Sequence, residues 1–391
     1  MDHPQCTSLV AALQAVPDPR CRRGVRYPWP LLLTLVTAAL ASGQQGMRAI
    51  GQWVSEHADE VLAHLDAPPP RLPSPATLRR AVRFVAVPAL EAQVAQFVAA
   101  LPAPTPPAAV PAPAAAPAPR WEGQAIDGQA VRGANRHGAH CHLVSRVRHR
   151  DAAVLAQQAV ADKRNEITAA PALLAGGDLH GVVITTDALL TQRAFAAQIL
   201  DQNGHYLLTV KENQPHLHWA VAQAFATPLV PQATDYVEVV TTHSTGHGRL
   251  EERTLERTAA LNDYLDWPGV GQVLRRTCRR VIVRTGEVQE EVTYGISSLP
   301  AASTTAAEME GLWRGHWTIE NRVHYVRDVT WGEDAGQGWL GSTPQALAAL
   351  RNGVLALVRA LGWTNIADAL RHYGAYAHRA LTLLATTPAR L

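Results

Sequence analysis

GVVITTDALL, residues 181–190, is the stretch that decides the fold. Its continuous run of aliphatic and β-branched residues, Val182 to Thr186, predicts a strand buried on both faces, as in parallel sheets. The strand ends at Asp187, a helix is expected from about 191 to 202, and HYLLTV (205–210) predicts another strand. A strand, a helix and a strand in this order form the unit from which sheets with covering helices are built.

Three further strands are predicted upstream of this unit. They are GQAIDGQAV (123–131), HCHLVSRVRH (140–149) and AVLAQQAV (153–160), and a helix is expected around 165–175. Further β-type runs precede a late helix and predict a β-rich insertion at about 236–300. The expected fold class is therefore α/β (α+β), with a mixed sheet, helices and this insertion.

A small all-helical domain is predicted at the N-terminus, residues 1–101. Apolar residues recur at helical spacing, and Ser74-Pro75 is a start signal for a helix over Thr77 to Phe84. Residues 102–120 are nearly all Pro and Ala, which cannot fill a core and predict an extended linker. Residues 121–391 are then expected to form a second domain.

Composition places the chain among soluble globular proteins, with 391 residues, 47% hydrophobic content and a formal net charge of +2. Cys6, Cys21, Cys141 and Cys278 have no paired spacing, which argues against a disulfide framework or a zinc ribbon. The apolar run 31–40 is shorter than the roughly 20 residues of a membrane span. We therefore expect a cytoplasmic protein without a membrane partner.

Arginines are clustered although the net charge is small, and clusters suit phosphate contacts. The clusters lie within residues 20–26, 79–83 and 275–284. Arg79, Arg80 and Arg83 fall in the predicted helix 77–84, which makes a DNA-reading helix one interpretation. A helix with a basic solvent face is an equally good alternative.

The segment RGHWTIENRVHYVRD, residues 314–328, predicts a helix with two different faces. At 100° per residue, one stripe collects Trp313, His316, Trp317, Glu320, His324 and Arg327. The neighbouring stripe is apolar. A carboxylate flanked by imidazoles, indoles and a guanidinium is typical of a site, whereas a solvated charged face is the alternative. The tryptophans are expected mainly in the core.

Three acidic residues stand on elements that a fold could bring together. Asp127 lies on the first strand after the linker, Asp187 at the end of the buried strand and Glu320 on the late helix. Hard divalent cations such as Mg²⁺ take carboxylate oxygens as ligands, and two such ions about 4 Å apart clamp both oxygens of a phosphoryl displacement. The chain has 33 acidic residues, so the sequence spacing alone is weak evidence.

The sequence around these acids forms six ordered motifs. They are IDGQAVRG (126–133), NEITAAPALL (165–174), ITTDALLTQ (184–192), YLLTVKENQ (206–214), HGRLEER (247–253) and HWTIENRVHYVRDVTWGED (316–334). Together they resemble the DDE transposases of bacterial insertion sequences, specifically the ISAs-type group that includes the H-repeat-associated proteins. PDPR (17–20) and PSPATLRR (73–80) resemble the helical domain that precedes the catalytic domain in this group.

This resemblance implies an RNase H-like catalytic core in which Asp127, Asp187 and Glu320 bind Mg²⁺, or Mn²⁺ in its place, and cut and join DNA strands. It also implies double-stranded DNA as the partner, with terminal inverted repeats and a homodimer on the DNA. The candidate DNA contacts are Arg327, His324, Lys211, Asn213 and Gln214, together with the arginines of helix 77–84. For Arg327 the alternative is an ion pair with an acidic neighbour on a solvated face.

Two positions depart from the resemblance, and two other functions stay open. Gln129 stands where a lysine is common, and Glu212 replaces a usual glycine, although neither is a proposed metal ligand. A degenerate relative could bind DNA specifically without mobilising it, and a nuclease could hydrolyse phosphodiesters without rejoining ends.

The histidines near Cys141, in HGAHCHL, are expected to be structural or solvent-facing because alternate strand residues point to opposite faces.

Overall fold

The computed structural model describes residues 8–23, 25–102, 120–134, 141–226, 237–246, 248–335 and 340–387. The chain divides into two units that interleave along the sequence. The helix-rich unit is Met1–Pro117, Gly128–Asn165 and Ile319–Leu391, and the sheet unit is Ala118–Asp127 and Glu166–Thr318. The predicted linker, residues 102–120, lies almost wholly outside the described residues, as do His137 and His140.

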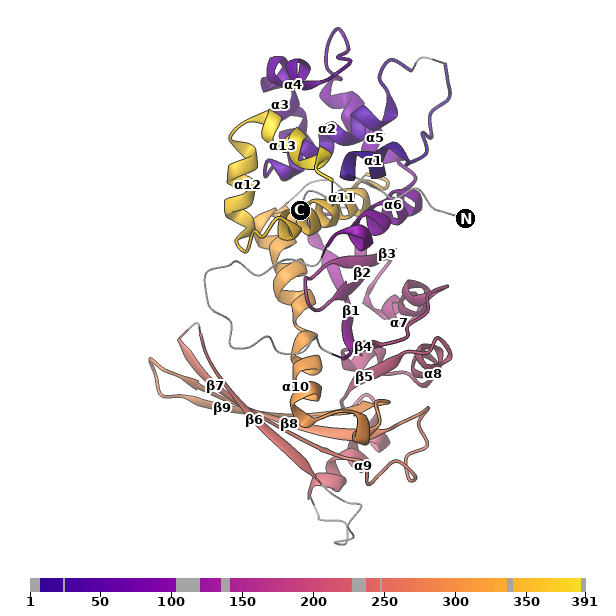
Figure 1. Cartoon of the computed structure of the whole chain (residues 1–391), viewed down its shortest axis with the longest axis vertical. Coiled ribbons are helices and arrows are strands. Elements are labelled where there is room, and N and C mark those ends of the chain that lie inside the picture. Colours follow the sequence, from indigo (N-terminus) through magenta and orange to yellow (C-terminus); the bar gives the residue numbers. More distant parts are fainter. Residues whose placement is uncertain are drawn as a thin grey trace. The chain divides into compact units, whose positions relative to one another are not determined.

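Nine strands form one mixed sheet in the order β3-β2-β1-β4-β5-β9-β8-β7-β6. Their bounds are β1 Glu122–Val131, β2 Cys141–Arg148, β3 Val154–Val160, β4 Val182–Thr186, β5 His205–Val210, β6 Glu238–Gly246, β7 Arg249–Thr258, β8 Gln272–Ile282 and β9 Val288–Ser297. The hairpin β2–β3 belongs to the helix-rich unit, and β1 begins in the sheet unit and ends in the helix-rich unit. The predicted α/β fold class, with a mixed sheet, a β-rich insertion and a helical N-terminal region, is confirmed (Figure 1).

The centre of the sheet unit is parallel. β4 pairs in parallel with both β1 and β5, and the bounds of β4 and β5 are those predicted from their apolar runs. Val183 and Leu207 are fully buried against Leu312 and Trp313 of α10 (Ala306–Gly315). The other helices of this unit are α7 (Glu166–Ala169), α8 (Arg193–Asp201) and α9 (Pro215–Ala226).

The insertion consists of β6–β9, which pair antiparallel and carry the third arginine cluster. Cross-strand pairs of opposite charge stabilise such a ribbon. Arg275 forms a bidentate salt bridge with Glu256 on the neighbouring strand, and Arg280 forms ion pairs with Glu251 and Glu291. These arginines therefore already have anionic partners within the ribbon.

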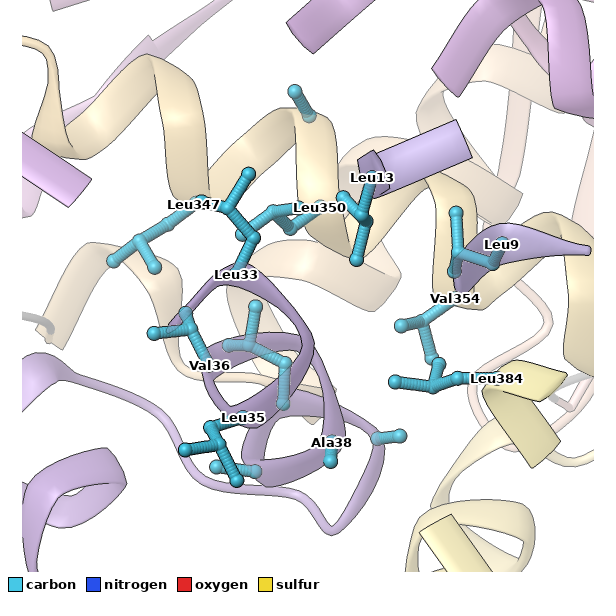
Figure 2. Close-up of a cluster of buried hydrophobic side chains, with 14 of the residues drawn as sticks. Leu9, Leu13, Leu33, Leu35, Val36, Ala38, Leu347, Leu350, Val354 and Leu384 are labelled. Carbon is cyan, nitrogen blue, oxygen red and sulfur yellow. The ribbon is translucent and has the colours of Figure 1, made fainter. Parts of the chain in front are cut away.

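The core of the helix-rich unit joins the N-terminal and C-terminal helices. Its helices are α1 (Leu9–Gln14), α2 (Trp29–Ala41), α3 (Met47–Glu56), α4 (Ala58–His64), α5 (Pro75–Phe84), α6 (Val87–Ala100), α11 (Thr343–Ala360), α12 (Ile366–Gly374) and α13 (Ala377–Ala385). Leu33 of α2 and Leu347 and Leu350 of α11 meet in this core, shown in Figure 2. Nearly all of α11 is buried, which is the pattern of a helix surrounded by other elements.

Gly353 lets α11 approach its neighbours. A Cβ atom at this position would lie 3.2 Å from Leu9 and 3.3 Å from Val94, closer than most such contacts.

Among the described residues no single helix is both long and apolar enough to cross a bilayer, and α5 with α6 meets that test only as a pair bent by 89°.

The late segment departs from a regular α-helix. After α10 the chain forms π-helical turns over Glu320–His324 and Val326–Thr330, which belong to the helix-rich unit. The amide of Tyr325 donates to the carbonyl of Glu320, and that of Trp331 donates to the carbonyl of Val326. These i→i+5 bonds widen the helix, so the stripe predicted from regular helical spacing does not hold beyond Glu320.

Glu91 of α6 is the half-buried acid of a polar network inside the helix-rich unit. Its Oε1 accepts bonds of 3.0 Å from both Gln157 of β3 and Gln345 of α11. Burial raises the pKa of Glu91 to about 7, although the two amide bonds oppose the shift. The carboxyl therefore keeps its proton in the folded chain over a range where the unfolded chain has lost it.

Replacing Glu91 with Gln should change how stability depends on pH. Because the pKa of Glu91 is raised above its ordinary value of 4.5 to about 7, its contribution to stability is present below pH 4.5 and is lost as pH rises to 7. Relative to wild type, Glu91→Gln should gain about 1–3 kcal/mol in free energy of unfolding over that range. Urea unfolding at several pH values measures this, and a difference that stays constant with pH would contradict it.

Candidate active site and nucleic-acid contacts

Asp127 and Asp187 come from neighbouring parallel strands of the sheet unit. The pairing of β1 with β4 ends with Ile126 opposite Thr186. Asp127 directly follows Ile126, and Asp187 directly follows Thr186. Neighbouring strands lie about 4.8 Å apart, so the two half-buried aspartates start side by side. Ligands of parallel sheets bind outside the carboxyl ends of the strands, which is where β4 stops.

The loop that carries Asp187 is held by hydrogen bonds at several points. Oδ1 of Asp187 accepts from the amides of Leu189 (3.0 Å) and Leu190 (3.3 Å), which caps a short 3-10 turn. The side-chain amide of Asn213 donates to the carbonyl of Ala188 at 2.7 Å, and that of Gln214 donates to the carbonyl of Thr191 at 3.0 Å. Asn213 and Gln214 therefore position this loop, and their contact with DNA stays a prediction.

His316 lies behind the end of β4 and was not singled out as a site residue from the sequence. Its Nδ1 is 3.1 Å from the hydroxyl of Thr185, two residues before Asp187. Burial lowers the pKa of His316 to about 4, although the negative charge of Asp187 opposes that shift. The ring is therefore neutral near pH 7. The sequence signal that could have identified His316 was its position on the same predicted helical stripe as Glu320.

Two of the three tryptophans of the late segment, Trp313 and Trp331, are core residues as expected, whereas Trp317 is half-buried. Trp313 is buried against β9, and the buried indole of Trp331 donates to the carbonyl of Leu40 at 2.9 Å. In the sheet unit the guanidinium of Arg276 lies 4.7 Å from the ring centroid of Trp313 and 4.4 Å from that of Trp317. These rings are thus engaged within the protein.

Glu320 belongs to the helix-rich unit and begins the first π-helical segment. Its side chain is exposed, as are those of Asn321 and Arg322. Within either unit, the described residues contain no group of three or more His, Cys, Asp or Glu that could hold a metal ion. The sheet unit contributes Asp127 and Asp187 as an adjacent pair, and the grouping of all three acids stays a prediction.

Arg327 is not placed to contact DNA, which corrects the prediction. Its side chain is 0% exposed, and its Nε and Nη2 donate to one oxygen of Glu333 at 2.9 and 2.6 Å. Arg351 donates to the other oxygen of Glu333 at 2.6 Å. Burial raises the pKa of Glu333, but the two guanidinium groups outweigh burial and hold it below its usual range.

His324 is also buried, so the prediction that it contacts DNA is wrong for this structure. Its carbonyl accepts a bond of 3.5 Å from the side chain of Gln129. The π-helical turns explain both corrections, because they turn His324 and Arg327 inward while Glu320 and Tyr325 stay exposed. The acidic partner of Arg327 is the buried Glu333, and the alternative of a pair on a solvated face is wrong as well.

The remaining basic candidates are exposed. Lys211 follows β5 directly, and Arg79, Arg80 and Arg83 project from α5. Ser74 caps α5 by accepting from the amide of Thr77 at 3.3 Å, at the predicted start signal. Exposure makes these four side chains available to phosphate, and their contact with DNA stays a prediction.

Substituting Asn213 should loosen the loop after Asp187. Asn213→Ala removes the bond to the carbonyl of Ala188, so hydrogen exchange at the amides of Leu189 and Leu190 should accelerate, because local opening becomes easier. Glu212→Ala is the matched control, since Glu212 is an exposed neighbour in the same turn. Equal exchange in both variants would show that Asn213 does not hold the loop.

Substituting Glu333 should destabilise the helix-rich unit. Glu333→Gln leaves two buried guanidinium groups facing a neutral amide, and breaking a buried ion pair costs about 3–5 kcal/mol. Asp368→Asn is the control, because its pair with Arg371 is exposed and should cost about 1 kcal/mol or less. Equilibrium unfolding in urea compares the two, and similar losses would contradict a structural role for the buried group.

Comparison with known proteins identifies relatives of the chain. The chain is 31% identical over 242 residues to "Putative transposase YncI" of Escherichia coli O157:H7, covering 60% of this chain and 61% of the relative. It is 32% identical over 239 residues to "H repeat-associated putative transposase YhhI" of E. coli K12, covering 58% and 61%. The chain therefore spans about three-fifths of the length of these relatives.

A solved structure and two family profiles also match. The cryo-EM structure of a piggyBac transposase synaptic complex with hairpin DNA aligns with 98% of this chain and 81% of that chain, at 7% identity and a TM-score of 0.44. Residues 10–98 match the family described as "DDE_Tnp_1-associated". Residues 104–337, more than half of the chain, match the family described as "Transposase DDE domain", and the chain belongs to this family of DDE transposases.

Proposed function

We propose that the chain is a DNA transposase that cuts the ends of a mobile element and joins them to new DNA. The observation that carries the proposal is the register of β1 and β4, which sets Asp127 beside Asp187. Membership of the DDE transposase family supports it. In this proposal Asp127, Asp187 and Glu320 are the three catalytic carboxylates.

The donor set fits a hard divalent cation. Carboxylate oxygens are the ligands that Mg²⁺ prefers, and it usually enters through one or two of them together with substrate phosphate. When bound, Mg²⁺, or Mn²⁺ in its place, would stabilise charge on the phosphodiester and activate the attacking oxygen. Oδ1 of Asp187 accepts hydrogen bonds from two backbone amides, which orient the carboxylate, and Asp187 would help to hold the cation.

The neutral imidazole of His316 suits this site. It holds the hydroxyl of Thr185 without adding a positive charge that would repel a cation beside Asp187. The Lys211 ammonium, exposed after β5, can attract the DNA backbone. We also propose that the partner is double-stranded DNA with terminal inverted repeats, that the chain acts as a homodimer on it, and that it works in the cytoplasm.

The test is cleavage of labelled duplex DNA that carries the ends of the element, with purified protein and Mg²⁺. Asp127→Asn, Asp187→Asn and Glu320→Gln should each lower cleavage more than about a hundredfold, since even outer partners of metal ligands cost 10–100-fold. DNA affinity should change little, because these residues are not the main phosphate contacts. Asp201→Asn, an exposed acid of the sheet unit, is the control and should cleave like wild type.

The outcomes separate the functions that remain open. Cleavage by Asp187→Asn at the wild-type rate would reject the assigned site. Cleavage without joined products would favour a nuclease, and specific binding without cleavage by wild type would favour a degenerate DNA-binding relative.

A further inference from the structure

A basic hollow of about 520 Å³ opens in the helix-rich unit between the segment before α2 and helix α5. Arg23, Arg26 and Arg80 line it together with Val25 and Phe84. Its volume lies within the range of about 300–1,000 Å³ found for sites of small ligands. Of the three arginines predicted as DNA contacts on α5, only Arg80 lines the hollow.

One wall of the hollow is fixed by Arg20. Its guanidinium donates to both carboxylate oxygens of Asp18 at 2.8 Å and to the carbonyl of Tyr27 at 2.9 Å. It also lies 5.2 Å from the ring centroid of Trp29. The bond to Arg20 holds the pKa of Asp18 below its usual range, so the acid stays charged and committed to this arginine.

The other three arginines keep their charge available. Arg23, Arg26 and Arg80 are exposed, and in the part of the chain that the structure describes they form no ion pair. Three guanidinium groups line one hollow, and none of its described lining residues is acidic, so the hollow suits a multivalent anion. Guanidinium groups bind phosphate through two parallel hydrogen bonds.

The hollow also presents apolar side chains to solvent. Phe84 is 58% exposed and Val25 is 43% exposed, although both are large hydrophobic side chains. The guanidinium of Arg83 lies 5.1 Å from the ring centroid of Phe84, which orients the ring. An oriented and exposed aromatic ring beside cationic groups is typical of a platform for an unstacked base.

We propose that this hollow binds one unstacked nucleotide of a DNA strand, with its phosphate at Arg23, Arg26 and Arg80 and its base against Phe84. A closed duplex offers phosphates on its outside and keeps its bases stacked, so it would leave the apolar lining without a partner. A nucleotide in a single-stranded end supplies both groups at once. This inference rests on the proposed function, because it assumes DNA as the partner.

The experiment measures binding of the full chain to a fluorescein-labelled oligothymidylate by anisotropy, without divalent metal so that no cleavage occurs. Arg80→Ala should weaken binding about tenfold and lower the slope of log affinity against log salt by about 1. Arg48→Ala is the matched control, since Arg48 is an exposed arginine of the same unit outside the hollow. Its affinity and slope should stay near wild type.

A second arm tests the base. Phe84→Ala should weaken binding of the oligothymidylate about fivefold or more, the lower end of what stacking on one aromatic ring contributes. It should not change binding of an abasic strand of the same length. Tyr376→Ala is the control, because Tyr376 is 51% exposed and has the guanidinium of Arg379 4.8 Å from its ring centroid, away from the hollow.

Three results would overturn the inference. The first is an equal loss of oligothymidylate affinity in Arg80→Ala and Arg48→Ala. The second is an equal effect of Phe84→Ala on the affinity for normal and abasic strands. The third is that free thymidine monophosphate displaces the strand at the same concentration of nucleotide. The last would assign the hollow to a free nucleotide. Asp187→Asn separates the two proposals, since it should abolish duplex cleavage and leave oligothymidylate binding intact, whereas failure at the hollow leaves cleavage by wild type unaffected.

Discussion

The parallel pairing of β1 with β4 sets Ile126 opposite Thr186, and the chemistry proposed for the sheet unit depends on that register. Because side chains alternate along a strand, shifting the register of β1 by one residue would move Asp127 to the other face of the sheet. The register is strongly specified, since Ile126 and Ile184 are fully buried. The bonds from Asn213 and Gln214 then fix the loop in which β4 ends.

Buried charge organises the helix-rich unit. Glu333 joins Arg327 to Arg351, and Arg327 donates in turn to Gln157, whose amide reaches Glu91. A network of this kind is costly to desolvate and adds little net stability compared with apolar packing. It does demand one arrangement, because each buried guanidinium needs its acceptor, and it ties the π-helical segment to α11.

The sequence predicted those parts of the fold that depend on local pattern. Continuous apolar runs located β4 and β5 to the residue, and Ser74-Pro75 located the start of α5 to within two residues. The sequence placed Asp127 on one predicted strand and Asp187 at the end of another, and the resemblance to DDE transposases implied their grouping. Their grouping required only that the two strands be adjacent and parallel.

The late helical segment could not be predicted in the same way. Helical spacing assumes i→i+4 bonds, whereas the segment after Glu320 uses i→i+5 bonds that nothing in its local composition announces. The burial of Arg327 depends on Glu333 and on the distant Arg351, which only the folded chain brings together. The loop bonds of Asn213 and the pairing of His316 with Thr185 are tertiary in the same sense.

Ion pairing within the insertion has a consequence at long range. Arg275 and Glu256 form a dipole, whose field falls off faster with distance than that of a single charge, and Arg280 lies between two glutamates. The arginines of α5 form no ion pair among the described residues, so each acts as a monopole. Arginines without a paired acid, such as those of α5, therefore attract a polyanion over a longer distance than paired arginines such as Arg275, out to about the 8 Å over which physiological salt screens charge.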